Sequence, residues 1–152
     1  MEGLAAARPK ATVVAAPRII KPAEEALWHV LLDLEGADAI LVRSAGLLHK
    51  LSALAREAKR PMPHLHADFS LNVANSGAAQ AFLELGISRL APTFDLDAKQ
   101  LCELTSALPV ADRERLEVII HTHVPIFHTE HCVFARCLSK GDSYKDCGQC
   151  EA

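Results

Sequence analysis

Long apolar runs are missing from this chain of 152 residues. No stretch approaches the roughly 20 consecutive apolar residues that cross a bilayer, so the sequence predicts no membrane span and no membrane partner. The first ten residues lack the apolar segment of a secretory signal. Half of all residues are apolar and the charges are mixed, which argues against disorder. We therefore expect one folded domain in a reducing compartment, the cytoplasm or an organelle stroma or matrix, and not a secreted protein.

An excess of positive charge is also missing, because the formal net charge is −3. A protein that binds phosphate groups generally would be basic, so the net charge does not indicate nucleic-acid binding. No Gly-rich phosphate loop follows the first apolar run, where Ala15-Ala16-Pro17-Arg18 stands instead. Neither the Gly-x-Ser-x-Gly motif of serine hydrolases nor the His-Glu-x-x-His motif of zinc proteases occurs. These absences weaken the dinucleotide-binding and common hydrolase interpretations.

Cysteine is scarce over the first two thirds of the chain, where Cys102 stands alone. Residues 121–150 then hold four histidines and four cysteines: His121, His123, His128, His131, Cys132, Cys137, Cys147 and Cys150. Thiolates and imidazoles at this density are the ligands of zinc or of an iron–sulfur cluster. In a reducing compartment, clustered cysteines more often hold metal than form disulfides. We expect Cys102, within an apolar helix, to be a buried small hydrophobic residue.

Apolar runs alternate with amphipathic segments along the chain. The predicted strands are Thr12–Ala16, Ala39–Val42, His64–Phe69, Ile87–Ala91 and Leu116–Ile120. The predicted helices are Lys21–Glu35, Leu47–Lys59, Ser76–Leu85 and Asp97–Leu108, with Gly36 ending the first, Ser76 capping the third and Gly86 closing it.

Strands that are apolar throughout and alternate with helices predict a parallel sheet covered by helices. The candidates are a doubly wound sheet or part of a (β/α)₈ barrel. A complete barrel needs about 250 residues. We therefore expect an α/β fold, a partial TIM-type (β/α) barrel truncated at its C-terminal side. Residues 1–10 would form a flexible segment and residues 11–152 the incomplete barrel with its cysteine cluster. The open barrel edges predict self-association.

Three polar residues are the candidate catalytic groups. Asp68 lies at the carboxyl end of a predicted strand, where barrel sites are built. His64, His66 and Asp68 alternate with apolar residues and should share one strand face, with Leu65 and Ala67 facing the helices. His121 and His123 likewise share a face and are candidates for contacting ligand or substrate. For His64 and His66 a structural role stays an alternative.

Several segments resemble peptidase family U-32, the collagenase-like peptidases. Glu117-Val118-Ile119-Ile120-His121 looks like the family's Glu-bearing strand, His131-Cys132 like its first cysteine position, and Cys137-Leu138-Ser139 like its second. Cys147 and Cys150 occupy the downstream cysteine region, and Ala67–Asn75 resembles the family's strand-and-loop segment. Thr122 departs from the usual Gly, the interval from Cys132 to Cys137 is short, and the insert at 125–131 resembles the long-chain branch. The likeness covers residues 38–150.

The resemblance implies a (β/α)₈-type barrel longer than this chain, so we expect the chain to be a fragment that by itself need not be active. The family label implies proteolysis of a protein substrate. Several relatives resemble oxygen-independent hydroxylases that bind a 4Fe–4S cluster and modify tRNA, rRNA or a quinone precursor, which implies an RNA substrate here.

Four thiolates match the ligand set of a 4Fe–4S cube, and the candidates are Cys132, Cys137, Cys147 and Cys150. In such relatives one ligand lies far downstream, so Cys150 or Cys137 would then be a bystander. Structural zinc and inert thiols stay alternatives. A further alternative is that Cys132 acts as a nucleophile with His131 or His128 as its base. Adjacent residues such as His131 and Cys132, however, rarely point toward the same reacting atom. The favoured hypothesis is an iron–sulfur RNA hydroxylase, with a peptidase or a non-catalytic metal-binding fragment as the alternatives.

Overall fold

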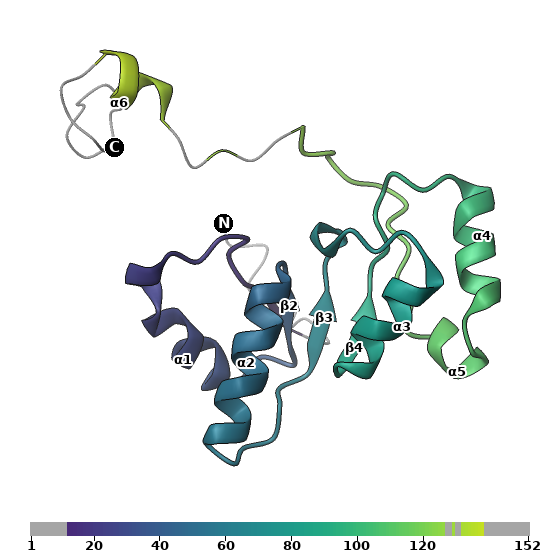
Figure 1. Cartoon of the computed structure of the whole chain (residues 1–152), viewed down its shortest axis with the longest axis horizontal. Helices are drawn as coiled ribbons and strands as arrows, with labels where there is room; N and C mark the ends of the chain where they lie inside the picture. The colour runs from purple at the N-terminus through teal and green to yellow at the C-terminus, as the bar shows by residue number, and fades with distance from the viewer. Residues whose placement is uncertain (1–11, 127–128, 130–131, 139–152) are drawn as a thin grey trace, which may run out of the picture. The chain divides into compact units, whose positions relative to one another are not determined.

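A computed structural model describes residues 12–126, 129 and 132–138 of the chain (Figure 1). The chain divides into two compact units, Met1–Ile119 and Ile120–Ala152. The expectation for residues 1–10 lies outside the described residues. Within the described residues, no helix is long and apolar enough to cross a membrane.

The first unit is a parallel sheet with helices between successive strands. Its strands are β1 (Val13–Ala15), β2 (Ala39–Val42), β3 (Leu65–Ala67) and β4 (Ile87–Leu90). Its helices are η1 (Pro22–Glu24), α1 (Ala26–Leu32), α2 (Ala45–Glu57), η2 (Phe69–Leu71), α3 (Ser76–Glu84), α4 (Ala98–Ala107) and α5 (Val110–Arg113). The strands lie in the order β1-β2-β3-β4 and are all parallel. Figure 1 shows β2, β3 and β4 side by side. This arrangement confirms the predicted α/β fold class and is consistent with part of a (β/α) barrel.

One face of this sheet packs on the helices. Ile40, Val42, Leu65, Ala67 and Ile87 are at most 3% exposed and form one cluster with apolar residues of α1, α2, α3 and α4. Leu65 and Ala67 therefore face the core, as predicted. Side chains alternate along a strand, so the intervening residues lie on the opposite face. There Val13 and Arg89 are exposed, and Leu41 and His66 are half-buried.

Local sequence signals determine where the helices begin and end. The Ser44 hydroxyl accepts a hydrogen bond from the Leu47 amide at 3.2 Å and begins α2. Asp97 and Gln100 exchange side-chain to backbone hydrogen bonds at the start of α4, which is a capping box. Gly36 and Gly86 follow α1 and α3 with φ of +79° and +98°, a conformation that favours glycine. Gly86 directly follows the C-cap residue Leu85 and ends α3, as predicted. Helix α1 already ends at Leu32 with Asp33 as its C-cap, so Gly36 lies in the following turn and the predicted helix end at Glu35 is wrong.

The prediction that Ser76 caps the third helix is wrong by one residue. Asn75 occupies the cap, with extended backbone, and its side-chain oxygen accepts from the Ala78 amide at 2.8 Å. Ser76 is the first helical residue. Asn and Ser are equally favoured as N-cap residues, so the residue type alone did not distinguish Asn75 from Ser76.

The predicted strand Leu116–Ile120 is also wrong. Only Leu116 forms a bridge, to Leu90, through hydrogen bonds of Leu90 N to Arg115 O and of Glu117 N to Leu90 O, each 2.9 Å. Val118 and Ile120 are 47% and 94% exposed. A strand needs a ladder of paired neighbours, and among the described residues this segment pairs only at that point.

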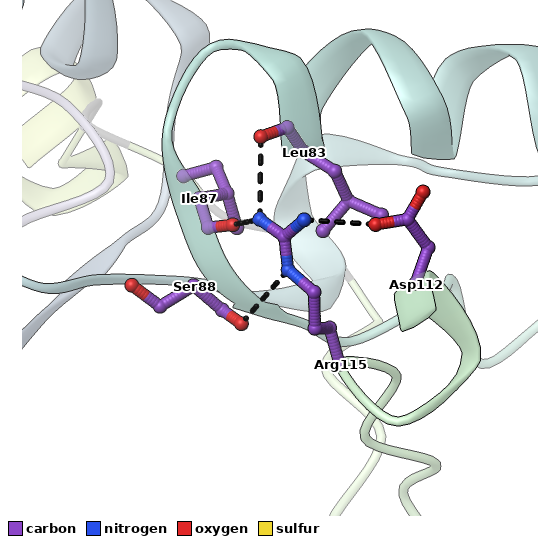
Figure 2. A network of polar contacts seen from close by, with 5 residues as sticks. All are labelled: Leu83, Ile87, Ser88, Asp112 and Arg115. Atoms are coloured by element: carbon purple, nitrogen blue, oxygen red, sulfur yellow. Dashed lines mark hydrogen bonds and ion pairs between the residues drawn. The ribbon is translucent and has the colours of Figure 1, made fainter. Parts of the chain in front are cut away.

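Arg115 fastens the segment before this bridge to the sheet (Figure 2). Its guanidinium donates to the carbonyl of Leu83 at 3.2 Å, to that of Ser88 at 3.4 Å and to that of Ile87, and it pairs with Asp112 at 2.8 Å. One side chain thus joins the end of α3, the start of β4 and α5.

The second unit contributes one described helix, α6 (Val133–Leu138). It is preceded by residues 120–126, which have no regular secondary structure.

Candidate functional site

Polar side chains gather in the first unit where the parallel strands end. Arg18 follows β1, Arg43 directly follows β2, and Asp68 directly follows β3. Carboxyl ends of parallel strands lie along one edge of the sheet, which is where α/β proteins build ligand sites. We call Arg18, Arg43, Asp68, Phe69 and Ser70 the strand-end cluster.

Asp68 is the centre of this cluster and is only 6% exposed. Arg43 Nε donates to Asp68 Oδ2 at 3.1 Å, and the Ser70 hydroxyl donates to the same oxygen at 2.8 Å. Arg43 and Asp68 continue the pairing of β2 with β3, since the Asp68 amide bonds to Val42 O at 2.9 Å. Burial of a carboxylate is tolerated because it is paired and hydrogen-bonded. The predicted candidate Asp68 is therefore a buried, oriented carboxylate at the strand ends.

The guanidinium group of Arg18 lies over the ring of Phe69, the residue that follows Asp68. Its guanidinium carbon is 5.3 Å from the centroid of the Phe69 ring, a cation–π distance. Phe69 in turn meets Phe94, which follows β4, edge to face at 4.9 Å. Arg18 Nε is buried and has no hydrogen-bond partner among the described residues. The ring pair therefore holds a cation whose hydrogen-bonding capacity is not fully used.

His66 belongs to a second group of charged side chains, on the sheet face opposite the core. It pairs in register with Arg89 of β4. Burial lowers the pKa of His66 below its ordinary value, Glu117 acts to raise that pKa, and Arg89 and His64 act to lower it. His66 therefore tends toward the neutral imidazole, which can both donate and accept a proton.

The predicted histidines of the second unit lie close together. The rings of His121 and His123 are 6.4 Å apart, in an edge-to-face arrangement, and both side chains are exposed. Residues 121–123 form no strand, so the predicted shared strand face does not apply to them. Their catalytic role stays a prediction.

Two of the four predicted metal ligands lie in the described part of the second unit. Cys132 directly precedes α6 and is half-buried, and Cys137 lies within α6 and is exposed; both are free thiols. The Ala135 amide donates to Cys132 Sγ at 3.5 Å, the kind of N–H···S contact that stabilises thiolate ligands. Cys147 and Cys150 lie outside the described residues, as do His128 and His131. Thiolates remain a chemically suitable donor set for a metal, and the ligand assignment stays a prediction, because within the described ranges no three candidate ligands converge.

The prediction for Cys102 is wrong, because its side chain on α4 is exposed. On α4 the buried position is Leu104, and Cys102 lies two residues, about 200°, around the helix from it.

Three charged residues near the strand ends were missed by the sequence analysis: Arg18, Arg43 and Arg89. Glu117 was noted only as part of the family-like strand and was given no role. The signal for Arg18 and Arg43 was present, since each cation closely follows an apolar run that was predicted as a strand. Nothing in the sequence alone placed Glu117 near His66, because that proximity depends on the bridge between Leu90 and Leu116.

Comparison with known proteins gives a family and one informative relative. The chain is 28% identical over 135 residues to tRNA hydroxylation protein P of Helicobacter pylori, a match that covers 84% of this chain and 29% of that protein. The chain thus spans less than a third of that relative. No solved structure gives a significant match. The profile of Peptidase family U32 matches residues 10–152. The chain belongs to Peptidase family U32.

Proposed function

We propose that this chain is part of an iron–sulfur-dependent hydroxylase that acts on RNA, with tRNA as the first candidate substrate. The observation that carries the proposal is the similarity to a tRNA hydroxylation protein over 135 residues. Because 84% of this chain is aligned, the match includes most of the four-stranded sheet.

Cys132, Cys137, Cys147 and Cys150 would hold a 4Fe–4S cluster, with zinc as the alternative metal. The cluster would supply electron transfer. Hydroxylation replaces a C–H bond with a C–OH bond, so an oxygen donor and an electron acceptor must also come from co-substrates.

The chain's own residues would orient the substrate and handle protons. Asp68 is fixed by Arg43 and Ser70 through Oδ2, and its Oδ1 takes no hydrogen bond from the described residues. That oxygen is free to accept a hydrogen bond from a substrate group. His121 and His123 are exposed and can contact the same or another part of a large substrate. We assign them substrate contacts and proton transfer.

The proposal is tested in a bacterial strain that lacks its own tRNA hydroxylation protein, so that the cell supplies the co-substrates. Expression of a protein in which this chain replaces the aligned segment of the tRNA hydroxylation protein should restore a tRNA nucleoside heavier by one oxygen atom, measured by mass spectrometry of digested tRNA. Asp68→Asn should reduce that nucleoside because the anionic acceptor is lost. Cys102→Ser is the matched control and should leave it unchanged.

The cofactor is tested on protein purified without oxygen. The wild-type chain should be brown and contain iron and sulfide. Cys132→Ser and Cys147→Ser should each abolish both, because a cluster needs all its thiolates at once. Cys137→Ser and Cys150→Ser identify any bystander.

Two outcomes would reject the proposal. Normal iron content in Cys132→Ser would exclude the assigned ligand set. A fully loaded chain that restores no hydroxylated nucleoside, yet cleaves gelatin in a Cys132-dependent manner, would establish the peptidase alternative instead.

A further inference from the structure

Two guanidinium groups and one buried carboxylate lie in the strand-end cluster. Arg43 is neutralised in part by Asp68 at 3.1 Å. Arg18 forms no ion pair within the described residues, and its ring contact with Phe69 leaves the charge uncompensated. The cluster thus carries one more cation than anion.

Contacts with neighbouring side chains restrict the conformations of both arginines. Asp68 accepts only from the Nε of Arg43, so the two terminal nitrogens of that guanidinium donate to no acceptor among the described residues. The Phe69 ring, which itself packs edge to face on Phe94, lies 5.3 Å from the guanidinium carbon of Arg18. Each arginine is only partly exposed. Guanidinium groups fixed in this way lose little entropy when they bind a ligand.

An unsatisfied N–H group that is buried destabilises a protein unless something accepts from it. Arg18 Nε is such a group. An oxygen ligand that reached it would remove this penalty and neutralise the extra charge. Planar guanidinium forks match the oxygens of phosphate and carboxylate groups.

We propose that Arg18 and Arg43 form an oxyanion-binding site at the carboxyl ends of β1 and β2, which takes the phosphate or carboxylate group of a ligand. Asp68 is the positioning residue of this site, since it orients Arg43. The oxyanion is a phosphate of a bound RNA or an anionic group of a small molecule. The site stands independently of the RNA hydroxylase proposal, because either source supplies the same chemistry.

Inorganic phosphate is the probe for the first experiment. The full chain is titrated with phosphate at constant ionic strength, and the arginine Nε–H signals are followed by nuclear magnetic resonance. The Arg18 signal should shift saturably. Arg18→Gln should weaken phosphate binding about ten-fold or more, the effect of losing charge-assisted hydrogen bonds.

Arg43→Gln would leave Asp68 buried without its cation, so that variant can fail to fold. Arg43→Lys keeps the charge and loses the fork, and it should weaken phosphate binding while the chain stays folded by circular dichroism. Arg56→Gln removes an exposed cation from α2 and is the matched control. Equal weakening by Arg56→Gln, or no saturable shift of the Arg18 signal, would overturn the proposal.

A single-stranded RNA and acetate distinguish the two sources. If phosphate competes with the RNA and Arg18→Gln weakens RNA binding, the site takes an RNA phosphate. If Arg18→Gln weakens phosphate and acetate binding but leaves RNA affinity unchanged, the site takes a small anion. Failure of the chain to bind any RNA, with phosphate binding intact, rejects the proposed function but not this site.

Discussion

His66 shows how one half-buried side chain responds to its neighbours. Burial is the largest influence on its pKa and acts to lower it, and Arg89 and His64 act in the same direction. Glu117 opposes them. The neutral form is therefore favoured in the folded protein, relative to an exposed histidine.

The charged neighbours of His66 predict how substitutions should change its pKa, which nuclear magnetic resonance can measure. Glu117→Gln removes the one influence that raises the pKa of His66, so the titration midpoint of His66 should fall below its wild-type value. Arg89→Gln should move it the other way. A His66 midpoint that ignores both substitutions would contradict the assigned cluster.

The same shift predicts how stability depends on pH. Since the pKa of His66 is lowered on folding, the unfolded chain binds more protons near and below the ordinary histidine value of about 6.5. The contribution of His66 to stability is complete above that pH and is lost as pH falls toward the folded-state pKa. Urea midpoints should therefore fall on acidification, and His66→Gln should reduce the slope. An unchanged slope in that variant would assign the acid sensitivity to other groups.

At the scale of elements, Arg115 should contribute substantially to stability, although it lies outside the helices and strands. It donates to three carbonyl groups and pairs with Asp112 (Figure 2). Arg115→Gln should lower the free energy of unfolding by about 2–3 kcal/mol, because carbonyl groups of α3 and β4 lose a charged donor.

Urea denaturation measures that loss, with Arg56→Gln as the control. The Arg56 side chain is exposed and donates only to a carbonyl of its own helix, so its replacement should change stability by about 0.5 kcal/mol or less. Equal effects of the two substitutions would mean that the Arg115 contacts contribute nothing beyond a surface charge.

Elements were predictable where local chemistry decides them. The four strands of the sheet were found because strands of a parallel sheet are apolar throughout, and the end of α3 was found at Gly86 because few other residues adopt positive φ. The segment 116–120 is equally apolar but forms one bridge, since pairing depends on distant partners that a local pattern does not contain. Asp68 was predictable from its place at a strand end. Arg18 and Arg43 join it only through contacts across strands.

At the scale of the whole molecule, the sheet has a covered face and a less covered one. Apolar residues of four helices pack on the first face. On the second, Val13 is 43% exposed and Arg89 is exposed. Among the described strands, β1 lies at the edge of the sheet and pairs on one side only. Exposed strand edges pair readily with other chains.

We therefore expect the isolated chain to self-associate through the edge of β1. Val13→Lys places a charge on that edge and should shift the chain toward monomer, as charged residues do on natural edge strands. Val30→Lys is the matched control, because Val30 is 56% exposed on α1 and away from the strand edge. Sedimentation velocity over a range of concentrations measures both. If the wild-type chain is monomeric throughout and melts cooperatively, the β1 edge is not a site of association. If Val30→Lys disperses the chain as well as Val13→Lys does, general charge and not the strand edge controls its association.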